Sequence, residues 1–177
     1  MQRIQNDWKE SQCMIAVMNM NGIQGHISFV QASPFDLTEL RVNLTNLRSR
    51  VAGYHVHHFP VPPLGASESS RCANDNLGGH WNPFGANVSS PTYPTGPGST
   101  HDMYEIGDLS SKHGSLAGQN AVEMNFTDHS LPLFGNNSIV GRSVVIHLPD
   151  VSNDAKPFFS ISSLWGRQPC VVSARTQ

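Results

Sequence analysis

At residues 53–59 the chain reads GYHVHHF, and this stretch decides the fold. Tyr54, Val56 and Phe59 are strand formers, and side chains of a strand point alternately to its two faces. His55 and His57 therefore share one face of a predicted strand, with the next histidine on the other. Two imidazoles on a rigid strand are half of a metal site. A His-x-His pair alone is more often a pair of ordinary, partly exposed histidines, so a metal site requires further ligands from elsewhere in the chain.

The composition predicts a single β-rich domain. The chain has 177 residues, of which 14% are charged, with 15 Gly and 12 Pro. This length allows one domain with a substantial core, and this composition favours short strands joined by long loops over a helical bundle. The net charge of −2 provides no basic surface for nucleic acid. No apolar run is long enough to cross a bilayer.

Cysteines and glycosylation sequons indicate an extracellular setting. Three cysteines, Cys13, Cys72 and Cys170, allow one disulfide and one free thiol. Four N-x-S/T sequons are candidate glycosylation sites and begin at Asn43, Asn87, Asn125 and Asn136. Residues 1–11 are polar and show no signal peptide. We therefore interpret the chain as a trimmed mature form or, preferably, as one secreted module with neighbouring domains in a longer protein.

Alternating patterns predict about eight strands. A hairpin turn at Asn21-Gly22 separates the first two. The segment 37–47 also has a helical interpretation because leucine is frequent, but its alternation favours a strand. The predicted strands are residues 13–20, 25–31, 37–47, 51–59, 121–128, 139–148, 158–164 and 170–174. Hairpin-like connections favour an antiparallel sandwich or barrel.

Two further histidines are candidate ligands. Residues 60–118 lack periodicity, and a loop this long in a compact domain is normally functional or disordered. It contains His80, which flanking glycine and proline can hold in a turn. His147 closes an apolar predicted strand. Nitrogen ligands without thiolate suit Cu(II) or Zn(II), and three histidines plus water would equally suit a zinc hydrolase.

Five motifs occur in a telling order. These are GYHVHHF, GGHWNPFG preceded by Cys72, EIGDLSSKHG, IVGRSVVIH and GRQPC. The series resembles the copper/zinc superoxide dismutase family and covers nearly the whole chain, from Cys13 to Cys170. The resemblance implies an all-β fold, an eight-stranded Greek-key β-barrel with one long ordered loop. It also implies a single domain at 12–177, preceded by a linker or leader at 1–11.

The resemblance implies roles for individual residues. The copper ligands fall on His55, His57, His80 and His147. The intrasubunit disulfide falls on Cys72 and Cys170, which leaves Cys13 as a small buried hydrophobe in the first strand. Arg167 falls where an arginine helps to bind the anionic substrate, and His80 where a histidine releases copper and takes up a proton.

The zinc subsite of the family is not matched. Asp108 stands where the family has an aspartate, but Glu105 replaces the nearest zinc histidine, and His101 is out of register. This resembles the copper-only branch, so we expect copper without zinc, with His101 left as a possible ligand. The second nitrogen of His80 then needs another partner. Glu105 is the candidate and Asp108 its support, unless both are solvated loop carboxylates.

The resemblance predicts copper-dependent dismutation of superoxide to O₂ and H₂O₂ in an extracellular setting. One alternative is an extracellular module that binds or sequesters copper with little catalysis. Another is a structural, glycosylated β-module. The family places a charged loop between His147 and Arg167, where this chain has Lys156 as its only lysine or arginine. Weak electrostatic steering of the substrate is therefore expected.

Overall fold

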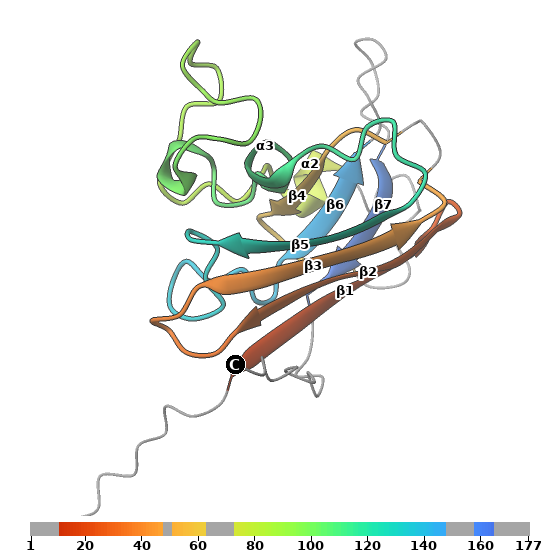
Figure 1. Ribbon diagram of the computed structural model, residues 1–177, viewed down its shortest axis with the longest axis horizontal. Helices are drawn as coiled ribbons and strands as arrows, with labels where there is room; N and C mark the ends of the chain where they lie inside the picture. The colour runs from red at the N-terminus through yellow and green to blue at the C-terminus, as the bar shows by residue number, and fades with distance from the viewer. Residues whose placement is uncertain (1–10, 48–50, 63–72, 148–157, 165–177) are drawn as a thin grey trace, which may run out of the picture.

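The computed structural model describes residues 11–47, 51–62, 73–147 and 158–164, and for 158–163 the backbone alone. The described strands form two antiparallel sheets that face each other (Figure 1). One sheet has the order β1-β2-β3-β5 and the other β4-β6-β7. The strands are β1 Gln12–Met20, β2 Ile23–Gln31, β3 Thr38–Thr45, β4 Tyr54–His57, β5 Val122–Asp128, β6 Ser143–His147 and β7 Phe158–Ser163.

The hairpin and the disputed third strand follow the sequence prediction. Asn21 and Gly22 have φ of 54° and 87°, the left-handed conformation that a two-residue hairpin turn needs. The segment predicted at 37–47 is the strand β3, in which buried and exposed residues alternate without exception. Leu40, Val42 and Leu44 point into the core, so the leucines that suggested a helix occupy one face of a strand.

A single hydrophobic core fills the space between the two sheets. Residues of β3 such as Leu40 pack in the same cluster as Val56 of β4 and Val144 and Ile146 of β6. The sheets therefore share one core, and the all-β architecture predicted from the sequence is confirmed. The structure describes seven of the eight predicted strands, because the last one, at 170–174, lies outside the described residues.

The strand that carries the histidine pair is shorter than predicted. It was expected at 51–59, but β4 is Tyr54–His57. On the N-terminal side the Ala52 N–H donates to the His147 carbonyl, and on the C-terminal side the His58 N–H donates to the Gly79 carbonyl. The second flank thus bonds to the long loop instead of continuing the sheet. Similarly, the strand expected at 139–148 is β6, Ser143–His147, because a turn occupies the residues before it.

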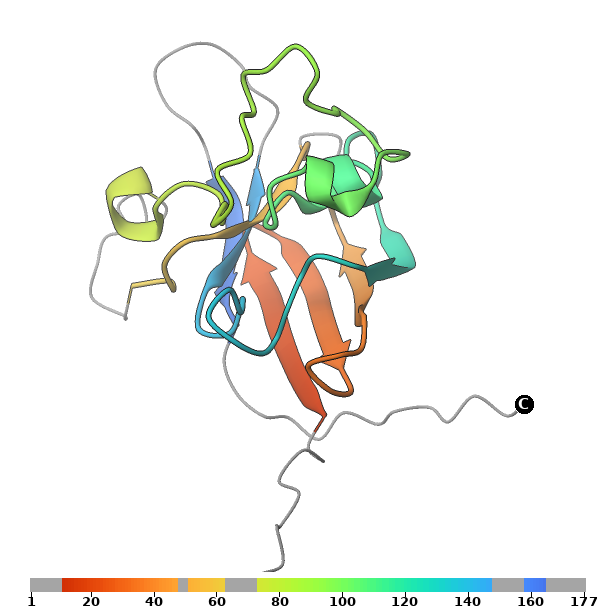
Figure 2. The same ribbon diagram turned by 90° about the vertical axis from the view of Figure 1, so that its left-hand side faces the viewer.

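The long segment expected to lack regular structure contains three short helices. These are α2 (Asn74–Leu77), the 3₁₀ helix η2 (His101–Met103) and α3 (Leu109–His113). Figures 1 and 2 show the described part of this segment beside β4, at one end of the sandwich. Isolated bridges join His57 to His80 and His55 to Asp108, so both arms of the loop are fastened to β4.

Candidate metal centre

The structure brings four histidines to one point. His55 and His57 come from β4, His147 from the end of β6, and His80 from the loop after α2. One nitrogen from each ring can be chosen so that all four lie within 4.8 Å of one another. Within the part of the chain that the structure describes, this is the one group of three or more histidine, cysteine or carboxylate side chains arranged in this way.

The hydrogen bonds of the rings indicate which nitrogen faces the centre. His57 Nδ1 lies 2.9 Å from the Gly78 carbonyl, to which it can only donate, so Nε2 is the nitrogen that can face the centre. His80 Nδ1 lies 2.7 Å from Glu105 Oε2, so its Nε2 is likewise the nitrogen that can face the centre. The Nε2 atoms of His57 and His147 are 3.2 Å apart. These nitrogens therefore converge on the same small volume.

His55 is turned the other way and supplies a test of metal fit. Its Nε2 lies 3.5 Å from Asp108 Oδ1, while its Nδ1 is buried and has no hydrogen-bond partner. A buried nitrogen without a partner costs free energy unless something binds to it. A copper or zinc ion among the four rings would bind this atom, so the residues present fit a transition metal with nitrogen ligands.

The pKa of His55 supports the same conclusion. Burial lowers it well below its ordinary value, and the neighbouring imidazoles of His80, His147 and His57 lower it further. The ring is therefore neutral at physiological pH. A metal ligand must be deprotonated, so His55 is ready to bind without first losing a proton.

Three backbone segments that carry site residues are joined by a closed ring of hydrogen bonds. The Val56 N–H donates to the Gly107 carbonyl at 2.9 Å, Trp81 N–H to the Val56 carbonyl at 2.8 Å, and Gly107 N–H to the Trp81 carbonyl at 2.8 Å. Val56 lies between His55 and His57, and Trp81 directly follows His80. This ring explains how irregular loops hold side chains in fixed positions.

A glycine is required where these segments meet. A Cβ on Gly107 would lie 2.4 Å from the Val56 carbonyl oxygen and 2.9 Å from the Trp81 nitrogen. Gly53 is constrained similarly, since a Cβ there would lie 2.7 Å from Cε1 of the His55 ring. Gly107 therefore leaves room for the backbone of Val56 and Trp81, and Gly53 leaves room for the His55 ring. Neither glycine was singled out by the sequence analysis.

The two predicted carboxylates are buried rather than solvated. Glu105 is 6% exposed and Asp108 is 5% exposed. Asp108 Oδ1 also accepts a hydrogen bond from the Ser111 N–H and so caps α3. Glu105 contacts His80 and Asp108 approaches His55, so each carboxylate faces a different histidine of the group. The interpretation of both as solvated loop residues is therefore wrong.

A tyrosine that the sequence analysis missed connects the Asp108 carboxylate to the backbone of Glu105. The Tyr93 hydroxyl donates to Asp108 Oδ2 at 2.7 Å and accepts from the Glu105 N–H at 3.2 Å. Burial raises the pKa of Tyr93 well above its ordinary value, with a further contribution from Asp108. Tyr93 thus stays a protonated donor. It lies in an aperiodic stretch rich in Pro, Gly and Ser, so no pattern in the sequence could mark it.

Other candidate residues lie apart from the group. His101 Nδ1 lies 3.3 Å from Asp128 Oδ1 and 3.0 Å from the His129 backbone nitrogen, so His101 belongs to a different cluster. His58 is exposed and packs against Trp81. Arg167 lies outside the described residues. The four sequon asparagines are all exposed on the described surface: Asn43, Asn87, Asn125 and Asn136.

The structure corrects the expectation for the cysteines. Cys13 is buried in β1, as expected, but it is disulfide-bonded rather than left over. Its partner lies outside the described residues, as do both cysteines of the expected Cys72–Cys170 pair. Three cysteines allow only one bridge within a chain. If Cys13 is bonded to another cysteine of its own chain, Cys72 and Cys170 cannot also be bonded to each other. The sequence did not reveal that β1 lies beside β7, the last described strand.

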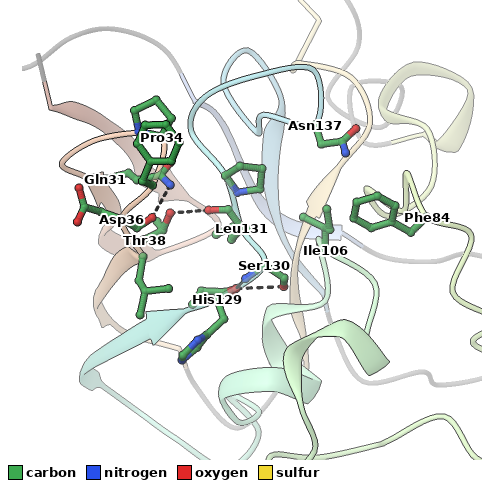
Figure 3. Close-up of a pocket in the computed structure, with 14 residues that line it drawn as sticks. Gln31, Pro34, Asp36, Thr38, Phe84, Ile106, His129, Ser130, Leu131 and Asn137 are labelled. Atoms are coloured by element: carbon green, nitrogen blue, oxygen red, sulfur yellow. Dashed lines mark hydrogen bonds between the residues drawn. The ribbon is translucent and has the colours of Figure 1, made fainter. Parts of the chain in front are cut away.

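A separate pocket of about 440 Å³ lies where β2, β3 and β5 end and contains none of the four histidines (Figure 3). Two of its polar side chains already have hydrogen-bond partners within the protein. Gln31 donates to the Asp36 carbonyl and accepts from the Leu133 N–H, and Thr38 donates to the Leu131 carbonyl. The histidine group therefore remains the candidate functional site.

A two-sheet β-sandwich with four converging imidazoles defines a metalloprotein with a transition-metal centre built from nitrogen ligands. The chain belongs to the copper/zinc superoxide dismutase family (SODC), whose family model matches residues 23–157. This confirms the family resemblance found in the sequence. None of the described helices is long and apolar enough to span a bilayer.

Relatives and solved structures agree with this assignment. The chain is 29% identical over 133 residues to superoxide dismutase [Cu-Zn] 5 of Dictyostelium discoideum, covering 75% of this chain and 76% of that protein. It is 25% identical over 125 residues to the extracellular superoxide dismutase [Cu-Zn] of Drosophila melanogaster, covering 71% and 59% respectively. The Cu(II) structure of Candida albicans superoxide dismutase 5 superposes with a TM-score of 0.67 at 25% identity, covering 95% of this chain and 100% of that one.

Proposed function

We propose that this chain is a copper-dependent superoxide dismutase that works without zinc in an extracellular setting. The observation that carries the proposal is the donor set: four imidazoles converge, and the buried Nδ1 of His55 has no other partner. Neutral imidazole nitrogens suit copper. His55, His57, His80 and His147 are the proposed copper ligands.

A copper ion bound there supplies one-electron chemistry, in which one superoxide gives up an electron and leaves as O₂ while a second takes up that electron and two protons to become H₂O₂. The protein holds the rings and handles the protons. His80 Nε2 takes up one proton and returns it, while Glu105 keeps the Nδ1 proton in place. Arg167 retains the anion near the site, a role inferred from the family resemblance alone.

The absence of zinc is supported by what occupies the second nitrogen of His80. If zinc were bound beside copper, this nitrogen would have to face the zinc ion. It instead contacts Glu105 Oε2 at 2.7 Å. His101 and His113, the other histidines of the same segment, are directed at Asp128. No second group of suitable donors occurs among the described residues.

An extracellular location is supported by the similarity to a relative named as extracellular, by the disulfide at Cys13 and by four exposed sequons. The shared core of both sheets supports a single domain within 12–177, and we propose residues 1–11 as a linker or leader. We propose that the domain acts on superoxide and has neighbouring domains in a longer chain.

Metal analysis combined with superoxide decay tests the proposal. We expect about one copper and no zinc per chain, and superoxide decay well above that of free buffer. Arg167→Ala should slow the decay while keeping the copper. Copper bound without faster decay would support the sequestering alternative, and stoichiometric zinc would contradict the zinc-free proposal.

A pair of histidine variants tests the ligand set. His57→Ala should lose copper and activity, because His57 faces the centre. His58→Ala is the matched control, since His58 is the next residue and is exposed on the opposite face. Retention of copper in both variants would remove His57 from the site.

Glu105→Gln tests the partner of His80. Glutamine keeps the size but not the charge, so we expect a loss of roughly 10–100-fold in copper affinity or in rate. Glu123→Gln is the control, because Glu123 is an exposed residue of β5. Unchanged activity and copper retention in Glu105→Gln would exclude Glu105 from the mechanism.

A further inference from the structure

Residues 101–113 carry both carboxylates that contact the histidine group, yet they have little regular structure of their own. η2 has three residues and α3 has five. Isolated helices this short are not stable in water. The backbone ring at Gly107 fastens the middle of the segment, so its two ends need a separate anchor.

Both ends of the segment meet one buried carboxylate. Asp128, the last residue of β5, is 1% exposed. At the start of the segment His101 Nδ1 lies 3.3 Å from Asp128 Oδ1. At its end, Lys112 Nζ and His113 Nε2 lie 2.6 Å and 2.9 Å from Asp128 Oδ2. Asp128 thus connects the segment to the large sheet, on which none of the four histidines lies.

Lys112 extends this connection to the peptide between the two carboxylates. Its ammonium donates to Asp128, to the Ile106 carbonyl at 2.8 Å and to Ser130 Oγ at 3.3 Å, which uses all three of its protons. Ile106 and Ser130 both line the pocket in Figure 3. Ile106 directly follows Glu105, so the lysine fixes the backbone next to the side chain that contacts His80.

The ion pair has no contact with solvent. The side chains of Lys112 and Asp128 are each 0% exposed. Replacing a buried ion pair by apolar residues often costs little stability or even gains it, whereas removing one partner is strongly destabilising. The Lys112–Asp128 pair is therefore better explained by the single position in which it holds residues 101–113 than by a contribution to overall stability.

We propose that Lys112 and Asp128 are positioning residues for the metal centre, which hold residues 101–113 so that Glu105 meets His80 and Asp108 meets His55. The inference rests on the proposed function only for its effect on rate, because the contact between Glu105 and His80 involves neither copper nor substrate. Neither residue touches the metal ligands or the substrate.

The test is the paired variant Lys112→Met/Asp128→Asn, which removes both charges together and so leaves no lone buried charge. In the metal-free protein, the ring nitrogen resonances of His80 report its hydrogen bond to Glu105. We expect these resonances to change in the variant, and the rate per bound copper to fall by about tenfold or more. Adding Glu105→Gln to the paired variant should lower the rate little further.

Thr38→Val is the matched control. Thr38 is the register partner of Asp128 in the sheet and donates a buried hydrogen bond to the Leu131 carbonyl. This variant should lower the melting temperature without changing the His80 resonances or the rate per copper. The proposal is overturned if the paired variant behaves in the same way, or if its effect on rate simply adds to that of Glu105→Gln.

A milder variant keeps the test decisive if the paired variant does not fold. His113→Phe removes the contact with Asp128 but can retain the stacking of His113 on Phe126, whose rings lie 4.7 Å apart. We expect a smaller shift of the His80 resonances in the same direction, and unchanged resonances would overturn the proposal. Because this readout needs no copper, it remains valid even if the wild-type protein proves not to be a dismutase.

Discussion

His55 and His57 lie two residues apart on one strand but are held by opposite ring nitrogens. The Gly78 carbonyl accepts from His57 Nδ1, which leaves Nε2 to face the centre, whereas His55 presents a buried Nδ1. The alternation of a strand predicts that both rings share a face. Which nitrogen each ring offers depends instead on the neighbouring acceptor, and this fixes the direction of each ligand.

Tyr93→Phe should weaken both the loop and the site. It removes the hydroxyl that donates to Asp108 and accepts from the Glu105 N–H. Loss of a hydrogen bond to a charged, buried acceptor costs about 2 kcal/mol. We expect a decrease of this size in the free energy of unfolding, measured by denaturant titration, together with a lower rate per copper.

Tyr104→Phe separates the two effects. The Tyr104 hydroxyl donates to the Gly96 carbonyl at 2.7 Å and accepts from the Ser99 N–H at 3.2 Å, within the same loop. Its removal should cost about 1 kcal/mol for each of these neutral hydrogen bonds and leave the rate unchanged. Equal rates in the two variants would show that Tyr93 only stabilises the loop.

Asp128 predicts a loss of stability in acid. Burial alone would raise its pKa, but contacts with His101 and His113 and the charge of Lys112 outweigh burial, so the pKa lies well below its ordinary value. The charge of Asp128 in turn acts to raise the pKa values of Tyr54 and Lys112. A carboxylate with a lowered pKa contributes its full stabilisation above the unfolded-state pKa of about 4, and this stabilisation decreases steadily as the pH falls below that value toward the folded-state pKa.

The measurement is the free energy of unfolding of the metal-free protein between neutral pH and about pH 3, a range that spans the ordinary carboxyl pKa. In Asp128→Asn the decrease below about pH 4 should be smaller, because the unfolded state no longer takes up a proton at this position. An identical pH dependence in the variant would mean that Asp128 titrates normally in the folded protein.

At the level of elements, β4 acts as the centre on which two loop arms converge. Its His57 bridges to His80 and its His55 to Asp108, while β6 pairs with it along the sheet. The two loop arms meet β4 at His80 and at Asp108, which are more than twenty residues apart in the sequence. The four-residue strand β4 therefore holds three segments in place, namely the two loop arms and β6, because each of them is hydrogen-bonded to it.

Gly107→Ala should disrupt this junction. The added Cβ would lie 2.4 Å from the Val56 carbonyl oxygen. The backbones of Gly107 and Val56 cannot move apart without breaking the ring of hydrogen bonds that joins them to Trp81. We expect a loss of about 3 kcal/mol in the free energy of unfolding, at the upper end for overpacking, with a matching loss of copper affinity in a competition titration.

Gly79→Ala is the control for this substitution. Gly79 precedes His80, and a Cβ there would have no heavy atom within 4 Å. Its stability and copper affinity should stay close to wild type. If both alanine variants behaved alike, the close approach at Gly107 would have no functional consequence.

Across the whole molecule, the distribution of charge bears on how fast an anion arrives. The net charge is −2, and Lys156 is the only lysine or arginine between His147 and Arg167. Electrostatic steering raises association rates by roughly 10–1,000-fold in proteins that use it, and it weakens with salt. We expect the rate constant for superoxide to change by much less than about tenfold when salt is added, as measured by pulse radiolysis. A steep decrease would show that a local positive field steers the anion.

The sequence by itself determined the strands and the identity of the four histidines. The apolar run before the Asn21-Gly22 turn identified the hairpin of β1 and β2, and alternation identified β3, because a strand with one buried face repeats every two residues. The ordered motifs around His55, His57, His80 and His147 carried the family resemblance, since each motif keeps its own local pattern.

Only the tertiary structure decided what surrounds those histidines. Tyr93, Lys112 and Asp128 lie in or next to loops, and their contacts join residues that no period relates. Such contacts are set when the two sheets pack and bury particular groups together, because a buried charge or donor must then find its partner wherever the fold brings one.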